Sequence, residues 1–237
     1  MVAHWTITER QEGGSRSYNH CHQRFTVTKL PIERGIKTKD VWAILRSRFS
    51  RGGLLKPNSN EVRARQDPLR ERYKHTAQEA WITDRGMTTR GVETDPFHGY
   101  VVPGSQDYGI VWPFGIHAAV GGYHDGPNPG DLLCAALAAC LDSTIRIIAG
   151  RLQLTLTSLE VAVTAEVDVR GTLVVDRLVP VGFQKMRCRV NLEAARGTDP
   201  KLVEKLCAAA EHSCVNLQTL RSGLAVETSF HGSEPQQ

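Results

Sequence analysis

Two cysteines, Cys140 and Cys214, lie in the two segments of the chain that are apolar enough to be central helices. Thiols on two packed helices can face each other even when they are far apart in sequence. Such a pair can reduce a peroxide. One thiolate attacks the O–O bond and becomes a sulfenic acid, the second thiol condenses with it to a disulfide, and an external dithiol restores both thiols. Buried cysteine is also a common inert packing residue, and composition alone favours that interpretation.

A reactive Cys140 needs a neighbouring cation, because apolar surroundings raise the pKa of a thiol. The helix that carries Cys140 offers no cation on the same face, since Arg146 lies six residues further along the chain. The cation must therefore come from another segment or from another subunit.

The helix around Cys140 is predicted over residues 128–152. Asn128 suits the N-cap, and Asp131 stands where a capping-box acid would lie. Gly150 is expected to end the helix. Apolar residues occur on nearly every face of this segment, which predicts a helix that is buried all round.

The remaining elements follow from periodicity and turn residues. We predict helices at 38–48, 67–75 (with Asp67 as its cap) and 198–222, and strands at 24–30, 76–84, 90–94, 99–102, 116–120, 158–170, 182–192 and 224–230. Residues 85–91 are predicted to form a turn. Strands gather before and between the helices instead of alternating with them, so the fold class is α+β with antiparallel sheets.

The first part of the chain differs in charge from the rest. Residues 1–75 carry sixteen Lys and Arg against seven Asp and Glu, although the net charge of the 237-residue chain is only +4. A basic arm can bind nucleic acid, but this one has no recognised nucleic-acid-binding motif. We therefore expect residues 1–65 to be a solvated, partly disordered extension without a nucleic-acid partner, and residues 66–237 to form the folded domain.

The composition also bears on location and on metal binding. No apolar run is expected to cross a bilayer, and no signal peptide is recognisable at the start, so we expect a cytoplasmic protein without a membrane partner. The six cysteines lack the spacing of a disulfide scaffold and include no C-x-x-C pair. The triplet His20–His22 lacks further ligands at a suitable spacing, and no metal or other cofactor is predicted.

Three blocks of sequence together resemble the OsmC/Ohr family of osmotically inducible and organic hydroperoxide resistance proteins. They are GDLLCAALAAC at 130–140, the paired strands within 158–192, and AAEHSC at 209–214 followed by GLAVET. The resemblance spans roughly residues 67–230 and implies an OsmC-like fold. In that fold antiparallel sheets surround two central helices in an intertwined homodimer, with sites at the dimer interface.

The resemblance also implies a function and assigns roles. It implies a peroxidase that reduces organic hydroperoxides with a redox-active cysteine pair, reset by a lipoyl or thioredoxin-like dithiol, in oxidative-stress defence. Cys140 would be the peroxidatic cysteine and Cys214 the resolving one. Either Arg85 or Arg90 would hold the thiolate, and Asp131 would orient that arginine. An alternative is a non-catalytic OsmC-like protein that binds an apolar small molecule or a partner at the dimer cleft. The alternative is motivated by Gly130, which stands where family members commonly have glutamate.

Overall fold

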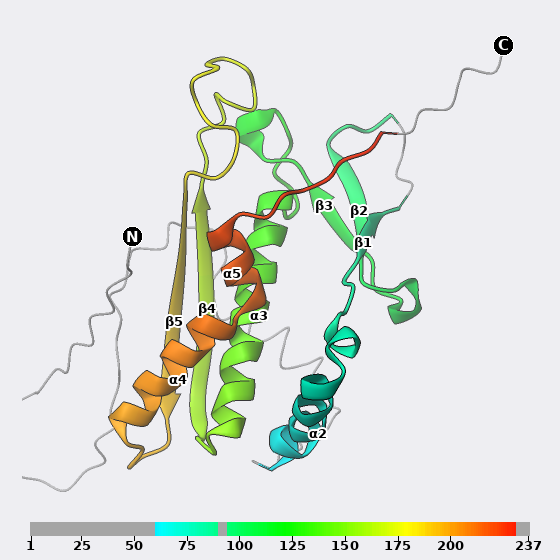
Figure 1. Ribbon diagram of the computed structural model, residues 1–237. Coiled ribbons are helices and arrows are strands. Elements are labelled where there is room, and N and C mark those ends of the chain that lie inside the picture. Colours follow the sequence, from blue (N-terminus) through cyan, green and yellow to red (C-terminus); the bar gives the residue numbers. More distant parts are fainter. Residues whose placement is uncertain (1–59, 90–93, 231–237) are drawn as a thin grey trace, which may run out of the picture. The chain divides into compact units, whose positions relative to one another are not determined.

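The computed structural model describes residues 60–89 and 94–230 (Figure 1). The elements are α2 (Glu61–His75), η1 (Ala77–Ala80), β1 (Gly86–Thr88), β2 (His98–Pro103), η2 (Gln106–Tyr108), β3 (Trp112–Gly115), η3 (Ala118–Val120), α3 (Pro129–Arg151), β4 (Leu156–Glu166), β5 (Lys185–Ala194), α4 (Pro200–Ser213) and α5 (Val215–Ser222). This mixture of helices and sheets agrees with the predicted fold class. The elements predicted at 24–30 and 38–48, and most of the one at 90–94, lie outside the described residues.

The chain divides into two compact units. Of the described residues, one comprises 60–84, 146–162 and 189–203, and the other comprises 85–89, 94–145, 163–188 and 204–230. Four elements, α3, β4, β5 and α4, continue from one unit into the other. Helix α2 starts at Glu61, before the domain boundary predicted at residue 65.

In the first unit, α2 lies against the last turn of α3. The guanidinium of Arg63 donates to the carbonyl of Arg151, with its Nε at 2.9 Å. Arg151 in turn donates to Asp67 at 2.9 Å. Gly150 makes this approach possible, since a Cβ there would lie 2.7 Å from Cγ2 of Val62. Gly150 was predicted to end the helix. It lies instead inside α3, which continues to Arg151, and it lets α2 pack closely beside α3.

Two predictions for residues 67–84 are wrong. The helix predicted to begin at Asp67 begins six residues earlier and contains Pro68. Asp67 does not cap the helix, and its carboxylate pairs with Arg151 instead. The strand predicted over 76–84 is a 3₁₀ turn followed by irregular chain in which Trp81 is 86% exposed.

The second unit contains an antiparallel sheet in the order β1-β2-β3. Strand β2 is the predicted strand at 99–102, extended by one residue at each end. Strand β1 forms where a turn was predicted. The strand predicted at 116–120 is instead a 3₁₀ turn, because Nδ1 of His117 accepts the N–H of Ala119 at 2.9 Å and caps it.

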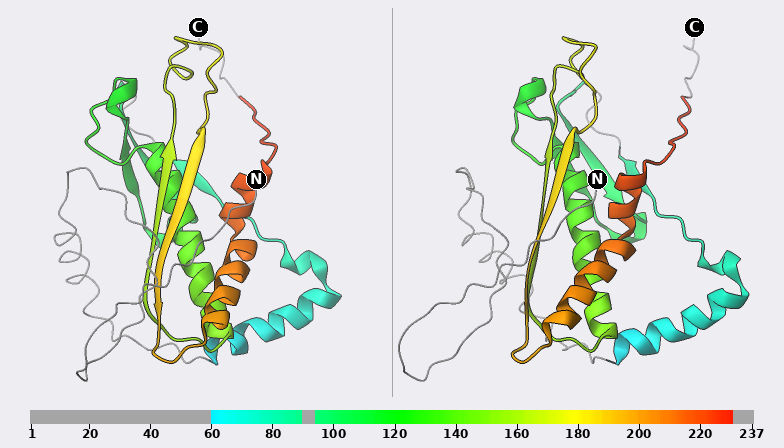
Figure 2. Two further views of the ribbon diagram at one scale, coloured as in Figure 1. Left: turned by 90° about the vertical axis from the view of Figure 1, so that its left-hand side faces the viewer. Right: turned by 60° about the vertical axis from the view of Figure 1, so that its left-hand side comes forward.

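Strands β4 and β5 form a second, two-stranded sheet. The N–H of Gln184 donates to the carbonyl of Glu166 at one end, and the N–H of Ala195 donates to that of Thr155 at the other, so the strands are antiparallel. Both predicted strands are confirmed with shifted ends. From Leu159 to Glu166 the side chains of β4 alternate between half-buried and exposed, as the apolar pattern predicts. The two strands run side by side in Figure 2.

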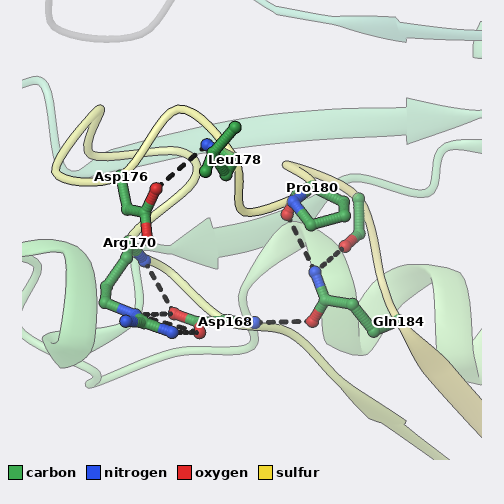
Figure 3. Close-up of polar contacts among 7 residues, drawn as sticks. Asp168, Arg170, Asp176, Leu178, Pro180 and Gln184 are labelled. Atoms are coloured by element: carbon green, nitrogen blue, oxygen red, sulfur yellow. Dashed lines mark hydrogen bonds and ion pairs between the residues drawn. The ribbon is translucent and has the colours of Figure 1, made fainter.

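The long connection from β4 to β5 has its own polar framework (Figure 3). The side-chain amide of Gln184 donates to the carbonyls of Pro180 and Gly182 at 2.8 and 2.7 Å, and accepts the N–H of Asp168 at 2.8 Å. The carboxylate of Asp168 pairs with the guanidinium of Arg170. These bonds order a connection that sequence periodicity leaves without structure.

Helix α3 is buried along one stripe and not all round. In the second unit the buried residues of this stripe are Leu137, Leu141 and Ile145. Leu133 and Ile147 are 39% and 40% exposed. By length and composition α3 is apolar enough to cross a membrane, a property that the core helix of a soluble protein can share, so it does not decide the expectation of no membrane-spanning segment.

The predicted helix at 198–222 is broken in two. Helix α4 ends at Ser213, Cys214 adopts an extended conformation (φ −75°, ψ 109°), and α5 begins at Val215. Gly223 ends α5 with a positive φ of 68°, as predicted. The closing strand predicted at 224–230 does not form within the chain.

Candidate redox site

The structure brings Cys140 and Cys214 together within the second unit. Their sulfurs lie 3.4 Å apart, and the thiol of Cys214 donates to Sγ of Cys140. A disulfide bond is about 2.05 Å long, so the sulfurs must approach by roughly 1.4 Å to form one. The pair is therefore poised for disulfide formation with a small local movement.

The two thiols differ in access. Cys214 is fully buried, at 0% exposure, whereas Cys140 is half-buried. Burial raises the pKa of the Cys214 thiol, and the neighbouring Cys140 raises that pKa further. The backbone N–H groups of Leu217 and Asn216, in the first turn of α5, act in the opposite direction and lower it. A molecule arriving from solvent meets Cys140 first.

The break between α4 and α5 is what aims Cys214 at Cys140. The side-chain amide of Asn216 donates to the carbonyl of Ala136 at 3.0 Å, which ties the start of α5 to α3 one turn before Cys140. Sequence periodicity did not predict this break, because the apolar spacing continues through Cys214. Asn216 was consequently missed as a residue of the site.

Two further contacts brace the break between α4 and α5. The side chain of Gln218 donates to the carbonyl of Glu211 at 2.7 Å, and Arg221 pairs with the carboxylate of Glu211 at 2.6 Å. The first contact gives the carbonyl of Glu211, near the end of α4, a side-chain donor. Both contacts use side chains of α5 and join this helix to α4.

Asp131 forms the capping box expected from the sequence. Its Oδ2 accepts the backbone N–H of Asn128 at 3.0 Å and the side-chain amide of Asn128 at 2.6 Å. In return Oδ1 of Asn128 accepts the N–H groups of Gly130 and Asp131 at 2.8 and 3.2 Å. Within the described residues Oδ1 of Asp131 has no hydrogen bond, so one carboxylate oxygen remains available to a guanidinium.

The predicted arginine is not joined to the thiols within the described part of the chain. Arg85 is exposed just before β1, and its carbonyl accepts the N–H of Gly104 at 2.7 Å. No hydrogen bond in the described ranges links its guanidinium to Cys140 or Asp131. Arg90 lies outside the described residues, so the choice between Arg85 and Arg90 stays open.

The other described cysteines are Cys134, Cys188 and Cys207. Cys134 and Cys188 are half-buried, and burial is the main cause that raises the pKa of each thiol. Cys207 is exposed on α4 and is not a core residue. Within residues 60–89 and 94–230 no group of three or more His, Cys, Asp or Glu side chains is arranged to hold a metal ion.

A polar cluster that the sequence did not reveal lies at the start of β2. Nδ1 of His98 is 2.8 Å from Oδ2 of Asp95, and its Nε2 is 3.0 Å from Oδ2 of Asp125. These two carboxylates raise the pKa of His98, with the hydrogen bond to Asp95 the larger cause. The ring of Tyr123 stacks on the imidazole at 5.7 Å between centroids. The cluster fixes the chain that leads into α3.

Part of the chain matches a known protein family. Residues 122–229 match the OsmC family, described as OsmC-like protein, and this part of the chain is an OsmC-like domain. The matched residues contain α3, both β4 and β5, and both cysteines of the pair. No curated protein matches the chain.

Similar solved structures include three bacterial proteins. An OsmC-like protein from Mycoplasma pneumoniae is 12% identical, covers 60% of this chain and 89% of its own, and has a TM-score of 0.47. An organic hydroperoxide resistance protein from Elizabethkingia anophelis is 17% identical, with coverages of 60% and 91% and a TM-score of 0.45. The organic hydroperoxide resistance protein OhrB of Bacillus subtilis is 21% identical, with coverages of 60% and 93% and a TM-score of 0.38.

Proposed function

We propose that this protein reduces organic hydroperoxides with Cys140 and Cys214, using electrons from an external dithiol. The observation that carries the proposal is the 3.4 Å separation of the two sulfurs inside an OsmC-like domain. A resident metal or cofactor has no part in the proposed cycle. A dithiol-driven cycle suits a reducing compartment, and we propose the cytoplasm.

In the first step the Cys140 thiolate attacks the distal oxygen of the hydroperoxide. The O–O bond breaks, the alcohol leaves after taking a proton, and Cys140 becomes a sulfenic acid. The Cys214 thiol then attacks that sulfur, and water leaves as the disulfide forms. A dithiol such as a lipoyl group or a thioredoxin-like protein exchanges with the disulfide, ends as a disulfide itself, and returns both cysteines to thiols. The difference in burial supports Cys140 as the sulfur that meets peroxide.

The arginine and Asp131 are proposed to serve the Cys140 of a second copy. Nine residues of α-helix separate Asp131 from Cys140 in the same chain, which corresponds to about 13 Å along the axis. One guanidinium is too small to contact both groups across that distance. If Asp131 orients Arg85 or Arg90 toward a thiolate, that thiolate belongs to the partner subunit. The site would then be complete only in a dimer.

A homodimer is also supported by apolar surface that one chain leaves uncovered. Part of α3 is exposed, as are Leu224, Val226 and Phe230, at 72%, 78% and 94%, in the segment predicted to be the closing strand. A second copy would cover these residues and give that segment a sheet to join. This intertwined arrangement is the one that the family resemblance implies.

The activity is tested by the consumption of cumene hydroperoxide with dithiothreitol or dihydrolipoamide as reductant. The parent protein should turn over, and Cys140→Ser should lose activity. Cys207→Ser, in the same helix-rich region, is the matched control and should keep it, because Cys207 is exposed and lies outside the pair. A Cys140→Ser protein as active as the parent would refute the mechanism.

Shared sites are tested by mixing two inactive variants, Arg85→Ala and Cys140→Ser, after unfolding and refolding them together. Random pairing makes half of the dimers mixed, and each mixed dimer holds one intact composite site, so about a quarter of the parental activity should return. No recovery, in a mixture shown to contain mixed dimers, would place the whole site in one chain. Full activity of Arg85→Ala by itself would assign the cation role to Arg90.

The alternative is a non-catalytic protein that binds an apolar molecule or partner at the dimer cleft. The observation that favours it is the exposed position of Arg85, without a hydrogen bond to Cys140 in the described part of the chain. The hydroperoxide assay separates the two functions, since a binding protein would show no Cys140-dependent turnover with either reductant.

A further inference from the structure

We propose that Asn216 is a positioning residue that sets the redox equilibrium of the Cys140–Cys214 pair by clamping the start of α5 onto α3. The inference deepens the proposed function and rests on the same thiol pair. It is carried by one contact, the hydrogen bond from the Asn216 side-chain amide to the Ala136 carbonyl at 3.0 Å.

The place of this hydrogen bond in the chain gives it leverage over the sulfurs. Asn216 is two residues after Cys214, and Ala136 is four residues before Cys140, so the bond joins the Asn216 side chain of α5 to the backbone of α3 within about one helical turn of both thiols. Cys214 itself lies in the break between α4 and α5, and its backbone bonds, from its N–H to the Ala210 carbonyl and from the Gln218 N–H to its own carbonyl, join it to α4 and α5 and not to α3. The side chain of Asn216 supplies the attachment to α3.

The two contacts that α5 makes with α4 do not replace the hydrogen bond between Asn216 and Ala136. Gln218 and Arg221 both contact Glu211, so they join α5 to α4 and not to α3. With these two contacts alone, α5 and the end of α4 can move away from α3 together. The separation of the sulfurs, 3.4 Å, would then increase in the dithiol form.

The consequence is a selective effect on one redox state. In the disulfide form the covalent bond itself fixes Cys214 beside Cys140. In the dithiol form only non-covalent contacts do so, and the clamp removes in advance much of the freedom that disulfide formation would otherwise have to remove. Loss of the clamp should therefore favour the dithiol over the disulfide. A residue that merely stabilised the fold would affect both forms equally.

The test equilibrates the whole chain with mixtures of oxidised and reduced dithiothreitol, without any peroxide. Two protein thiols give two electrons and two protons to oxidised dithiothreitol, whose S–S bond breaks as the Cys140–Cys214 bond forms. After acid quenching and alkylation, mass spectrometry of the peptides measures the fraction of this particular disulfide. The equilibrium constant for its formation is the readout.

Asn216→Ala should lower that constant roughly two- to tenfold, because one neutral hydrogen bond is worth about 0.5–1.5 kcal/mol. A tenfold change corresponds to a potential about 30 mV less negative. Asn216→Asp keeps the shape of the side chain without an N–H donor and should lower the constant at least as much. It also serves if the alanine variant does not fold. Asn191→Ala is the matched control, since the Asn191 amide contacts Glu160 on the β4–β5 sheet at 3.4 Å and should leave the constant unchanged.

Constants equal to the parental value in Asn216→Ala and Asn216→Asp would overturn the inference, even if both variants were less stable to urea. An equal decrease in Asn191→Ala would overturn it as well. Because the assay contains no hydroperoxide, it separates this inference from the proposed function. A chain that forms the disulfide with the expected dependence on Asn216 but consumes no hydroperoxide would refute only the latter.

Discussion

Replacing Asp131 separates its structural role from its proposed catalytic one. Its Oδ2 accepts two hydrogen bonds from Asn128 in the capping box, at 3.0 and 2.6 Å. Loss of such a cap costs about 1 kcal/mol, within a range of roughly 0.5–2 kcal/mol. Asp131→Ala should therefore lower the free energy of unfolding by about 1 kcal/mol, or the Tm by about 2–4 °C for a chain of this size.

Asn128→Ala provides the matched control, because it breaks the same capping box from the other side. It removes the bonds to the N–H groups of Gly130 and Asp131. Its loss of stability should equal that of Asp131→Ala, while the carboxylate stays available to the arginine. Hydrogen bonds to charged groups are worth about 1.5–3 kcal/mol, so losing the carboxylate should lower kcat/KM at least about tenfold.

The assay pairs urea unfolding with initial rates of cumene hydroperoxide consumption for the two variants. The expected result is equal stability with at least tenfold lower kcat/KM in Asp131→Ala alone. Equal activity in the two variants would show that Asp131 acts only as a helix cap, and the proposed orientation of the arginine would be wrong.

Three other predictions concern the framework around the site. NMR titration should give a pKa of His98 above the ordinary value of about 6.5, and a pKa at or below that value would contradict the cluster. The ion pairs of His98 should therefore contribute stability that is fully present below that pH, as long as the carboxylates stay ionised, and that is lost as the pH rises through the folded pKa. His98→Asn should remove this contribution. Gly150→Ala should lower the free energy of unfolding by up to about 2 kcal/mol, because crowding against Val62 outweighs the gain in helix propensity. Combining it with Val62→Ala should relieve the loss. A Gly150→Ala protein more stable than the parent would refute this prediction. Gln184→Ala should speed amide exchange in the β4–β5 connection by about tenfold or more, measured by mass spectrometry, and unchanged exchange would deny its role as the organising side chain.

Local sequence signals predicted the elements that depend on local causes. The capping residues Asn128 and Asp131 placed the start of α3, and strict alternation placed β4 and β5. Strand β3 was missed because Pro113 argues against a strand interior, yet β3 is at the edge of its sheet, where proline is tolerated. The strand predicted at 76–84 is instead a 3₁₀ turn followed by an irregular, exposed segment.

The candidate site was predictable in part. The cysteine pair follows from two apolar helical segments and from the resemblance to the family. The break at Cys214 was not predictable, since no glycine or proline interrupts residues 201–222, and the attachment of Asn216 to Ala136 is a contact between distant segments. Burial along one stripe of α3 also differs from the predicted burial on every face. Apolar residues mark every helix face that becomes buried, including a face that the proposed second copy would cover.

The most direct test of the proposed chemistry is to add one equivalent of cumene hydroperoxide to the reduced protein and map its disulfides by mass spectrometry without reduction. The proposed cycle predicts one product, a disulfide between Cys140 and Cys214, whose sulfurs lie 3.4 Å apart in the dithiol form. In Cys214→Ser the same treatment should leave Cys140 as a sulfenic acid or its further oxidation products. Both thiols remaining free while the peroxide persists would contradict the account.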